Sequence, residues 1–216
     1  RGLVGSEMCI RDRVYMKSFS YSPHAPICNN SPFILGATMN ELKWLAIARG
    51  LIGTQEIVGA RHNPVVLGLW QSAFDAVNQK TPVIFKNDET AWCGGFVAGV
   101  LAKADLARHI PKSFPMARAW ATAGTKLNRP AYGCVVVFWR GSPKSATGHV
   151  GFVVGQDKAG NLMVLGGNQG NAVNIKPFGR NRVLAYRWCG TQPQPAPHRY
   201  ELPVLRSDGR VSVDEA

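Results

Sequence analysis

Three apolar stretches with helical spacing occupy the first half of the chain. In the first, apolar residues recur at intervals of three and four positions: Trp44, Leu45, Ile47, Ala48, Leu51 and Ile52. This spacing predicts an amphipathic helix. Residues 64–77 predict a second helix, because a proline suits the first helical turn, where its missing N–H is not needed. Residues 91–106 are apolar enough to predict a third helix, and Thr90 or Asp88 is expected to cap its first turn.

The second half of the chain changes to short runs rich in valine and other strand-forming residues. After a short helix at residues 116–123, strands are predicted at residues 134–139, 149–154, 162–165, 173–175 and 183–187. Helices followed by strands indicate an α+β fold. We therefore expect N-terminal helices packed on an antiparallel sheet of about five to six strands.

Residues 39–190 are predicted to form one domain, because no Pro/Gly-rich linker divides them. Residues 1–38 are expected to be a disordered or non-native extension, with a short arm packed on the domain as the alternative. Residues 1–13 resemble a translated sequencing adapter, so that native translation would begin at Met16 or Met39.

Residues 191–216 are expected to form a proline-rich C-terminal tail. Its first part, up to Pro197, should be extended, and residues 202–205 and 210–213 are predicted to pair as a small hairpin. No apolar run has the length of a membrane span, and the chain does not start with the pattern of a signal peptide. Export by an ordinary signal peptide is therefore not expected.

Cys93 is the candidate nucleophile, because it lies in the first turn of the third predicted helix. Free amides and the helix dipole favour a negative charge there, so the pKa of the thiol is predicted to fall. The Cys93 or Gly94 backbone N–H would supply part of an oxyanion hole. The alternative is that Cys93 is a small buried apolar residue.

His149 and Asn168 are the candidate base and orienting residue. The runs at residues 149–154 and 162–165 flank a turn-forming segment and predict an antiparallel hairpin. If its turn is centred between Lys158 and Ala159, His149 faces Asn168, with their Cβ atoms about 5 Å apart. A bulge near Gly166 would shift the register by one residue and turn Asn168 to the opposite face.

Positive charge dominates the composition and is concentrated in the second half. Lys and Arg number 25 against 13 Asp and Glu, a formal net charge of +12. Between Lys103 and Arg187 the acids are Asp105 and Asp157. Such a surface attracts polyanions, and this fits both anionic bacterial walls and nucleic acid. Zinc-finger, helix-turn-helix and aromatic RNA-binding patterns are absent from the sequence, so no specific nucleic-acid partner is expected.

The remaining cysteines and the histidines do not form a framework. Cys9 and Cys28 precede the predicted domain, and Cys134 and Cys189 are expected to be buried thiols, with a disulfide between them as the alternative. The sequence contains no HxxxH or CxxC pair. No metal and no cofactor are therefore expected.

Residues 40–188 resemble the NlpC-like and CHAP-like cysteine peptidoglycan hydrolases of the papain-like superfamily, particularly the small phage-endolysin group. The segments that carry the resemblance are Trp44-Leu45-Ala46-Ile47-Ala48, Gly53-Thr54-Gln55-Glu56, Gly59, His62-Asn63-Pro64, Trp92-Cys93, Ala117-Arg118-Ala119-Trp120, Gly133, Val136-Val137-Phe138, Gly148-His149-Val150-Gly151-Phe152 and Leu165-Gly166-Gly167-Asn168-Gln169. The resemblance implies Cys93 as nucleophile, His149 as base and Asn168 as orienting residue. Many relatives carry Ser or Ala where this chain has Gly94 and Gly95, which loosens the helix start.

The resemblance implies amide hydrolysis in the peptidoglycan stem peptide through a thioester, by a cysteine endopeptidase or a muramoyl-alanine amidase. Trp92, Gly94, Asp88 and Gln169 are the further candidates for oxyanion or substrate contacts, although Asp88 also suits helix capping. The expected partners are peptidoglycan and anionic wall polymers. We expect a monomer of phage or prophage origin, made in the bacterial cytoplasm and acting on the wall after release.

Two other functions fit the same sequence. One is a catalytically silent wall-binding or phage tail-associated component, which would keep the fold and the basic surface without depending on Cys93. The other is an antibacterial toxin amidase, which shares the chemistry and differs in delivery. Neither alternative changes the predicted fold.

Overall fold

The computed structural model describes residues 41–212, so the expectations for residues 1–38, for Cys9 and Cys28 and for the last four residues lie outside the described part. The elements, in chain order, are α1 (Lys43–Gly50), α2 (Pro64–Ala76), η1 (Val83–Phe85), α3 (Cys93–Lys103), η2 (Ala107–His109), η3 (Ala117–Thr122), β1 (Thr125–Leu127), β2 (Val135–Trp139), β3 (Gly148–Gln156), β4 (Leu162–Gly166), β5 (Asn174–Phe178), η4 (Arg180–Arg182), β6 (Val183–Trp188) and η5 (Pro197–Tyr200).

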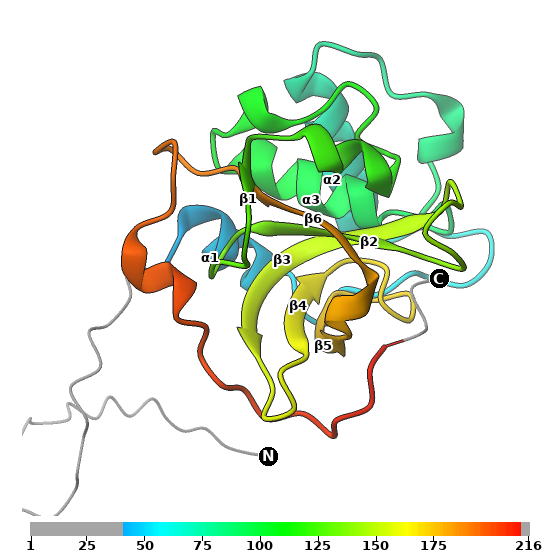
Figure 1. Cartoon of the computed structure of the whole chain (residues 1–216). Helices are drawn as coiled ribbons and strands as arrows, with labels where there is room; N and C mark the ends of the chain where they lie inside the picture. The colour runs from blue at the N-terminus through cyan, green and yellow to red at the C-terminus, as the bar shows by residue number, and fades with distance from the viewer. Residues whose placement is uncertain (1–40, 213–216) are drawn as a thin grey trace, which may run out of the picture. The chain divides into compact units, whose positions relative to one another are not determined.

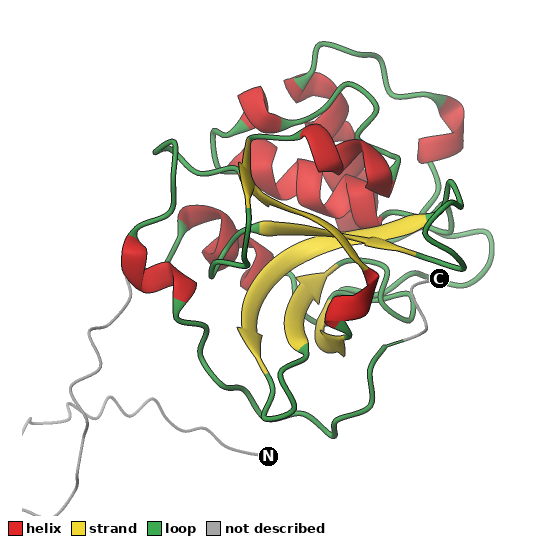
Figure 2. Ribbon diagram, viewed as in Figure 1, coloured by secondary structure: helices red, strands yellow, loops and turns green. Residues whose placement is uncertain are grey.

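A single six-stranded sheet organises the second half, with the strand order β1-β6-β2-β3-β4-β5. Every neighbouring pair of strands is antiparallel. Helices α2 and α3 lie together beside this sheet (Figures 1 and 2). The predicted α+β class is therefore confirmed. The sequence pattern missed β1, whose three residues are too few to show an alternation.

The α2–α3 pair forms because α3 presents small residues to bulky ones. A side chain on Gly95 would lie 2.7 Å from the Trp70 ring, and one on Gly99 would lie 2.8 Å from Leu69. Asn63 caps α2 by accepting a hydrogen bond from the Val65 N–H at 2.9 Å. Helix packing thus explains Gly95 and Gly99 of α3, which are buried with all residues from Cys93 to Leu101.

The β3–β4 hairpin has the predicted register at its centre. Phe152 pairs with Leu165 and Val153 with Val164, as a turn between Lys158 and Ala159 requires. The bulge lies at Val153–Gly155, not at Gly166–Gly167. The ladder ends at Leu165, so it does not extend to His149 and Asn168.

The C-terminal residues do not pair with one another as the sequence predicted. Gln156 of β3 forms a parallel bridge with Val204, and the Ser212 N–H donates to the Pro177 carbonyl at 2.7 Å. The predicted hairpin is therefore wrong, because each of its two segments bonds to a strand of the sheet instead. The proline-rich stretch also ends in the helical turn η5, whose Arg199 is buried.

Within residues 41–212, no helix combines the length and the apolar character needed to cross a membrane. Cys134 and Cys189 are free, buried thiols, which confirms that expectation. Burial raises the pKa of each to about 12.

Candidate active site

Cys93 is the first residue of α3, as the sequence predicted, and its side chain is 6% exposed. The expected cap is wrong: Trp92 occupies the N-cap position, and in the described chain no side chain makes the capping hydrogen bond. The Thr90 hydroxyl instead donates to the Ile84 carbonyl at 2.7 Å. The helix start is therefore held by tertiary contacts of Trp92.

The predicted fall in the thiol pKa is also wrong. Burial raises the pKa of Cys93, and the backbone N–H groups of Val150, Gly94 and Cys93 itself oppose this rise without cancelling it. A helix start lowers a thiol pKa where water also solvates the charge, and here burial removes that water. The contact with the Val150 N–H also places the thiol beside the start of β3, next to His149.

His149 is fully buried on β3, with its ring stacked parallel to Phe178 at 5.2 Å between centroids. Its Nε2 atom lies 3.0 Å from Gln169 Oε1. Its Nδ1 atom has no hydrogen-bond partner among the described residues. Burial lowers the pKa of His149 to about 4 against the Gln169 hydrogen bond, and the charges of Arg182, Arg140 and Lys176 lower it further.

Gln169 orients this imidazole. Its amide nitrogen donates to the Asn174 carbonyl and Oδ1, each at 2.9 Å, so its Oε1 faces His149 as an acceptor. The ring must then carry its proton on Nε2, which leaves the lone pair on Nδ1. Cys93 and His149 are thus both neutral in the resting site, since burial disfavours both charged forms.

Asn168, predicted to orient His149, points elsewhere. The strand β4 ends at Gly166, and Asn168 has a φ of 57°, so the chain has left the extended conformation that the register argument assumed. With its amide oriented to satisfy both groups, Asn168 donates to Glu56 Oε1 at 3.0 Å and accepts from the Trp92 N–H at 3.1 Å. The next residue, Gln169, takes the predicted role.

Asp88 is buried and holds a loop; its hydrogen bonds do not involve the thiol or the imidazole. Its carboxylate accepts from the backbone N–H groups of Ile57 and Asn63, each at 2.8 Å, and lies 2.9 Å from His62 Nδ1. Burial alone would raise the pKa of Asp88, but these hydrogen bonds lower it below its ordinary value. Asp88 fixes residues 57–63, which corrects the expectation that it caps α3.

Trp92 and Gly94 stand where the sequence placed them, on either side of the nucleophile. The Trp92 indole N–H donates to Glu56 Oε1 at 2.6 Å. Gly94 lies under the 111–116 loop, where an added side chain would meet the Phe114 carbonyl oxygen at 2.2 Å. Its N–H lies against the Cys93 thiol. Packing therefore explains why residue 94 is glycine. Its backbone N–H also lies beside Cys93.

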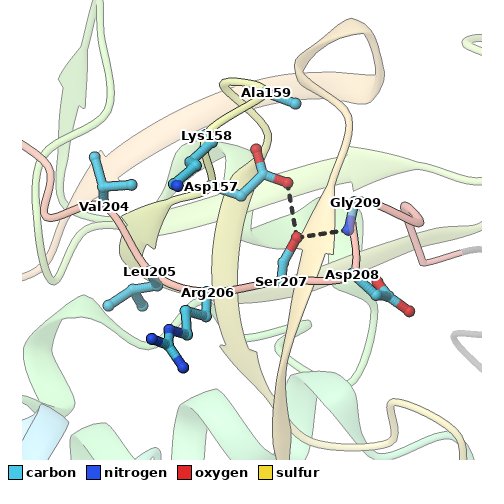
Figure 3. A pocket seen from close by; sticks show the side chains of 9 residues that line it. All are labelled: Asp157, Lys158, Ala159, Val204, Leu205, Arg206, Ser207, Asp208 and Gly209. Carbon is cyan, nitrogen blue, oxygen red and sulfur yellow. Dashed lines mark hydrogen bonds between the residues drawn. The ribbon is translucent and has the colours of Figure 1, made fainter.

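A surface cavity of about 400 Å³ lies away from these residues. Figure 3 shows its lining, in which Asp157 accepts a hydrogen bond from the Ser207 hydroxyl at 3.0 Å. The β3–β4 turn and residues 204–209 form its walls. Among the described residues, no cluster of three His, Cys, Asp or Glu has the arrangement of a metal site.

Sequence reasoning did not foresee the contacts of Glu56 with Trp92 and Asn168 or the hydrogen bond of Gln169 with His149. The signal for Glu56 was its place in a segment that resembles the cysteine hydrolases without an assignable chemical role. The signal for Gln169 was weaker, because a turn after β4 has no regular periodicity from which to place a side chain.

Comparison with known protein families finds one match. Residues 85–168 match the model of the CHAP domain, a segment that includes Cys93, His149 and Asn168 and ends one residue before Gln169. No curated protein and no solved structure matches the chain. The resemblance to CHAP-like cysteine peptidoglycan hydrolases is confirmed, and the match indicates a hydrolase of the amidase or peptidase type acting on peptidoglycan.

Proposed function

We propose that this protein, with its CHAP-type segment, hydrolyses an amide bond in the peptidoglycan stem peptide in the manner of an endolysin. The observation that carries the proposal is the hydrogen bond from His149 Nε2 to Gln169. It leaves Nδ1, which has no partner in the described chain, as the ring atom able to accept a proton. The N–H of Val150, the residue after His149, contacts the Cys93 thiol, which supports a site that contains both residues.

The proposed reaction begins from the neutral pair. Nδ1 of His149 takes the proton of Cys93 as the sulfur attacks the substrate carbonyl, forming the C–S bond and an oxyanion. The N–H groups of Cys93 and Gly94 stabilise that oxyanion. The C–N bond then breaks, and the amine leaves with the proton from the imidazolium. Water hydrolyses the thioester, which releases the acid and restores the thiol.

Gln169 accepts the Nε2–H throughout this cycle and stabilises the orientation of the imidazolium. This role replaces the one that the sequence assigned to Asn168. The bond cut is either within the stem peptide or between the muramoyl group and L-alanine, by the endopeptidase or amidase reaction respectively. Both reactions use the same thiol and imidazole.

The positive charge of the protein favours binding to the bacterial wall. A net charge of +12 attracts the protein to anionic wall polymers as well as to its peptidoglycan substrate. We propose a monomer of phage or prophage origin that is made in the bacterial cytoplasm and reaches the wall after release. Nucleic acid is not a specific partner in this proposal.

The test is digestion of purified peptidoglycan by the wild type and by Cys93→Ala, with mass spectrometry of the released fragments. The wild type should release fragments whose new termini distinguish endopeptidase from amidase. Cys93→Ala should lower the rate by at least about 10³-fold, because the nucleophile is lost. Cys189→Ala is the matched control, since it removes a buried thiol outside the site and should cut normally.

Two results would contradict this proposal. Equal release by Cys93→Ala would exclude the thioester route, and no release by a folded wild type would favour a wall-binding or tail-associated component. A toxin amidase would cut at the muramoyl-alanine bond and be encoded beside an immunity protein. Circular dichroism of each variant checks that the fold is kept.

A further inference from the structure

Glu56 lies outside the segment that matches the CHAP domain, yet its carboxylate reaches both halves of the candidate site. Its Oε1 atom accepts a hydrogen bond from the Trp92 indole at 2.6 Å and one from the Asn168 amide at 3.0 Å. Trp92 directly precedes the nucleophile Cys93, and Asn168 directly precedes Gln169, the partner of His149. One carboxylate oxygen therefore connects the helix start to the loop that carries the orienting amide.

The connection is closed by a third hydrogen bond. Asn168 accepts from the backbone N–H of Trp92 at 3.1 Å, so that Glu56, Trp92 and Asn168 each contact the other two. Gly167 lies directly against this triangle, since an added side chain would come within 2.6 Å of both the Trp92 ring and Phe96. The loop after β4 can move little relative to α3 while these contacts hold.

The backbone around Glu56 is held to the same loop. The Glu56 N–H donates to the Asn171 carbonyl at 3.0 Å, and the Val173 N–H donates to the Thr54 carbonyl at 2.8 Å. Gln55 pairs with Ala172 in an antiparallel bridge. These bonds fix the backbone from which the Glu56 side chain extends, so the carboxylate is held near its two donors.

The surroundings of Glu56 are unusual for a surface carboxylate. Burial raises the pKa of Glu56, the Trp92 hydrogen bond opposes this, and the charges of Asp88 and Glu89 raise it further. A side chain used only for solubility would be expected to face water, away from other acids. Its two donors make the half-buried carboxylate a connection between two segments.

We propose that Glu56 is a positioning residue of the active site, which sets the placement of Cys93 relative to Gln169 and thereby to His149. This inference deepens the proposed function and rests on it. It also means that the segment matching the CHAP domain is incomplete as a catalytic unit in this chain. Residues 53–56 supply the carboxylate and the short ladder that hold the site together.

The experiment compares Glu56→Ala and Glu56→Gln with the control Glu89→Gln. Glu89 is an exposed carboxylate near the same loop that contacts neither Trp92 nor Asn168. Each variant is measured for kcat and KM on a soluble stem-peptide fragment, for its melting temperature, and for the rate of Cys93 alkylation by iodoacetamide as a function of pH. Mass spectrometry of the Cys93 peptide separates this thiol from the other cysteines.

Glu56→Ala should lower kcat by about 10²-fold with little change in KM, because a small displacement of the reacting groups has this effect. It should also shift the pH profile of Cys93 alkylation. Glu56→Gln should restore both readouts, since a neutral amide oxygen can still accept two hydrogen bonds. Glu89→Gln should match the wild type.

Three results would overturn the positioning role. The first is a Glu56→Ala variant with a lower melting temperature but an unchanged kcat and alkylation profile, which indicates a purely structural contact. The second is an equal shift in Glu56→Ala and Glu56→Gln, which indicates a direct effect of charge. The third concerns Asn168→Gly, the variant to use if Glu56→Ala does not fold. It removes the side chain that joins Glu56 to Trp92, and an unchanged kcat in it would overturn the positioning role.

The alkylation profile needs no peptidoglycan, so the two proposals can fail separately. If the wild type cuts nothing but Glu56→Ala shifts the profile and Glu56→Gln restores it, the positioning role is supported and the peptidoglycan function is overturned. If the wild type cuts and the Glu56 variants match it in every readout, the positioning role is overturned alone.

Discussion

The proposed nucleophile and its proposed base come from two regions that are built in different ways. Cys93 sits at the start of a regular helix, where the position of the thiol follows from local geometry. His149 sits on a regular strand, but its partner Gln169 comes from an irregular turn between β4 and β5. The place of the thiol on the helix is therefore set within a few residues, although tertiary contacts of Trp92 hold the helix start itself. The strand side depends on contacts between segments that are distant in the sequence.

The electrostatic behaviour of the two regions differs as well. On the helix side, three backbone N–H groups stabilise a thiolate, and burial outweighs them. On the strand side, three cations and burial both oppose an imidazolium, and the Gln169 hydrogen bond alone favours it. Burial thus favours the neutral form of both groups, whereas the sequence predicted a lowered pKa for the thiol.

The largest expected effect is on the pH dependence of stability, and it concerns His149 on the strand side of the site. The pKa of His149 is about 4 in the folded protein against an ordinary value of 6.5. Between these values the unfolded chain binds a proton that the native site does not, so stability falls as the pH drops from 6.5 to about 4. Urea unfolding at both pH values should show a loss of roughly 3 kcal/mol.

The matched variant is His149→Phe, which should remove this part of the pH dependence. The pKa values of Asp88 and Asp157 are lowered, so their contributions are lost at more acidic pH. The lowered pKa of His109 and the raised pKa of Glu56 act in the same range, but they are common to wild type and variant and cancel in the comparison. A variant with the same slope as the wild type in this range would mean that His149 is protonated in the folded state. The proposed neutral pair would then be wrong.

The second expected effect is on kcat, and it distinguishes the contribution of Gln169 from that of Asn168. Gln169→Ala should lower kcat by about 10²-fold, because the imidazole loses the acceptor that fixes its tautomer and orientation. Asn168→Gly should lower kcat less, by about tenfold. Glycine adopts the φ of 57° without strain, so that variant tests the side chain alone. The reverse order of effects would return the orienting role to Asn168.

The smallest expected effect is a loss of stability when the loop after β4 is forced away from α3. Gly167→Ala adds a methyl group at 2.6 Å from Phe96 and Trp92, so the α3 side and the loop side must separate. Urea unfolding should show a loss of about 2 kcal/mol. Gly68→Ala is the control, because it lies within α2 with no atom within 4 Å of the added group and should be neutral or stabilising. Equal stability of the two variants would show that the loop adjusts freely.

The sequence by itself determined most of the helices and strands of the described chain and where Cys93 and His149 lie on them. Hydrophobic spacing located all three α-helices, because a 3.6-residue period is a local property that packing preserves. Valine-rich runs located five of the six strands. Cys93 at a helix start and His149 at a strand start were predictable for the same reason. The order helices then strands also predicted the fold class.

The tertiary structure alone decided how these residues work together. The side chain that meets His149 depends on where β4 ends and on the φ of Asn168, and a one-residue change there moves the role to Gln169. The pKa of Cys93 depends on how much water the packing excludes, and the helix start does not report this. The role of Glu56 depends on contacts with Trp92 and Asn168, which are 36 residues or more away along the chain. Local patterns report local geometry, and burial and long-range hydrogen bonds are properties of the assembled fold.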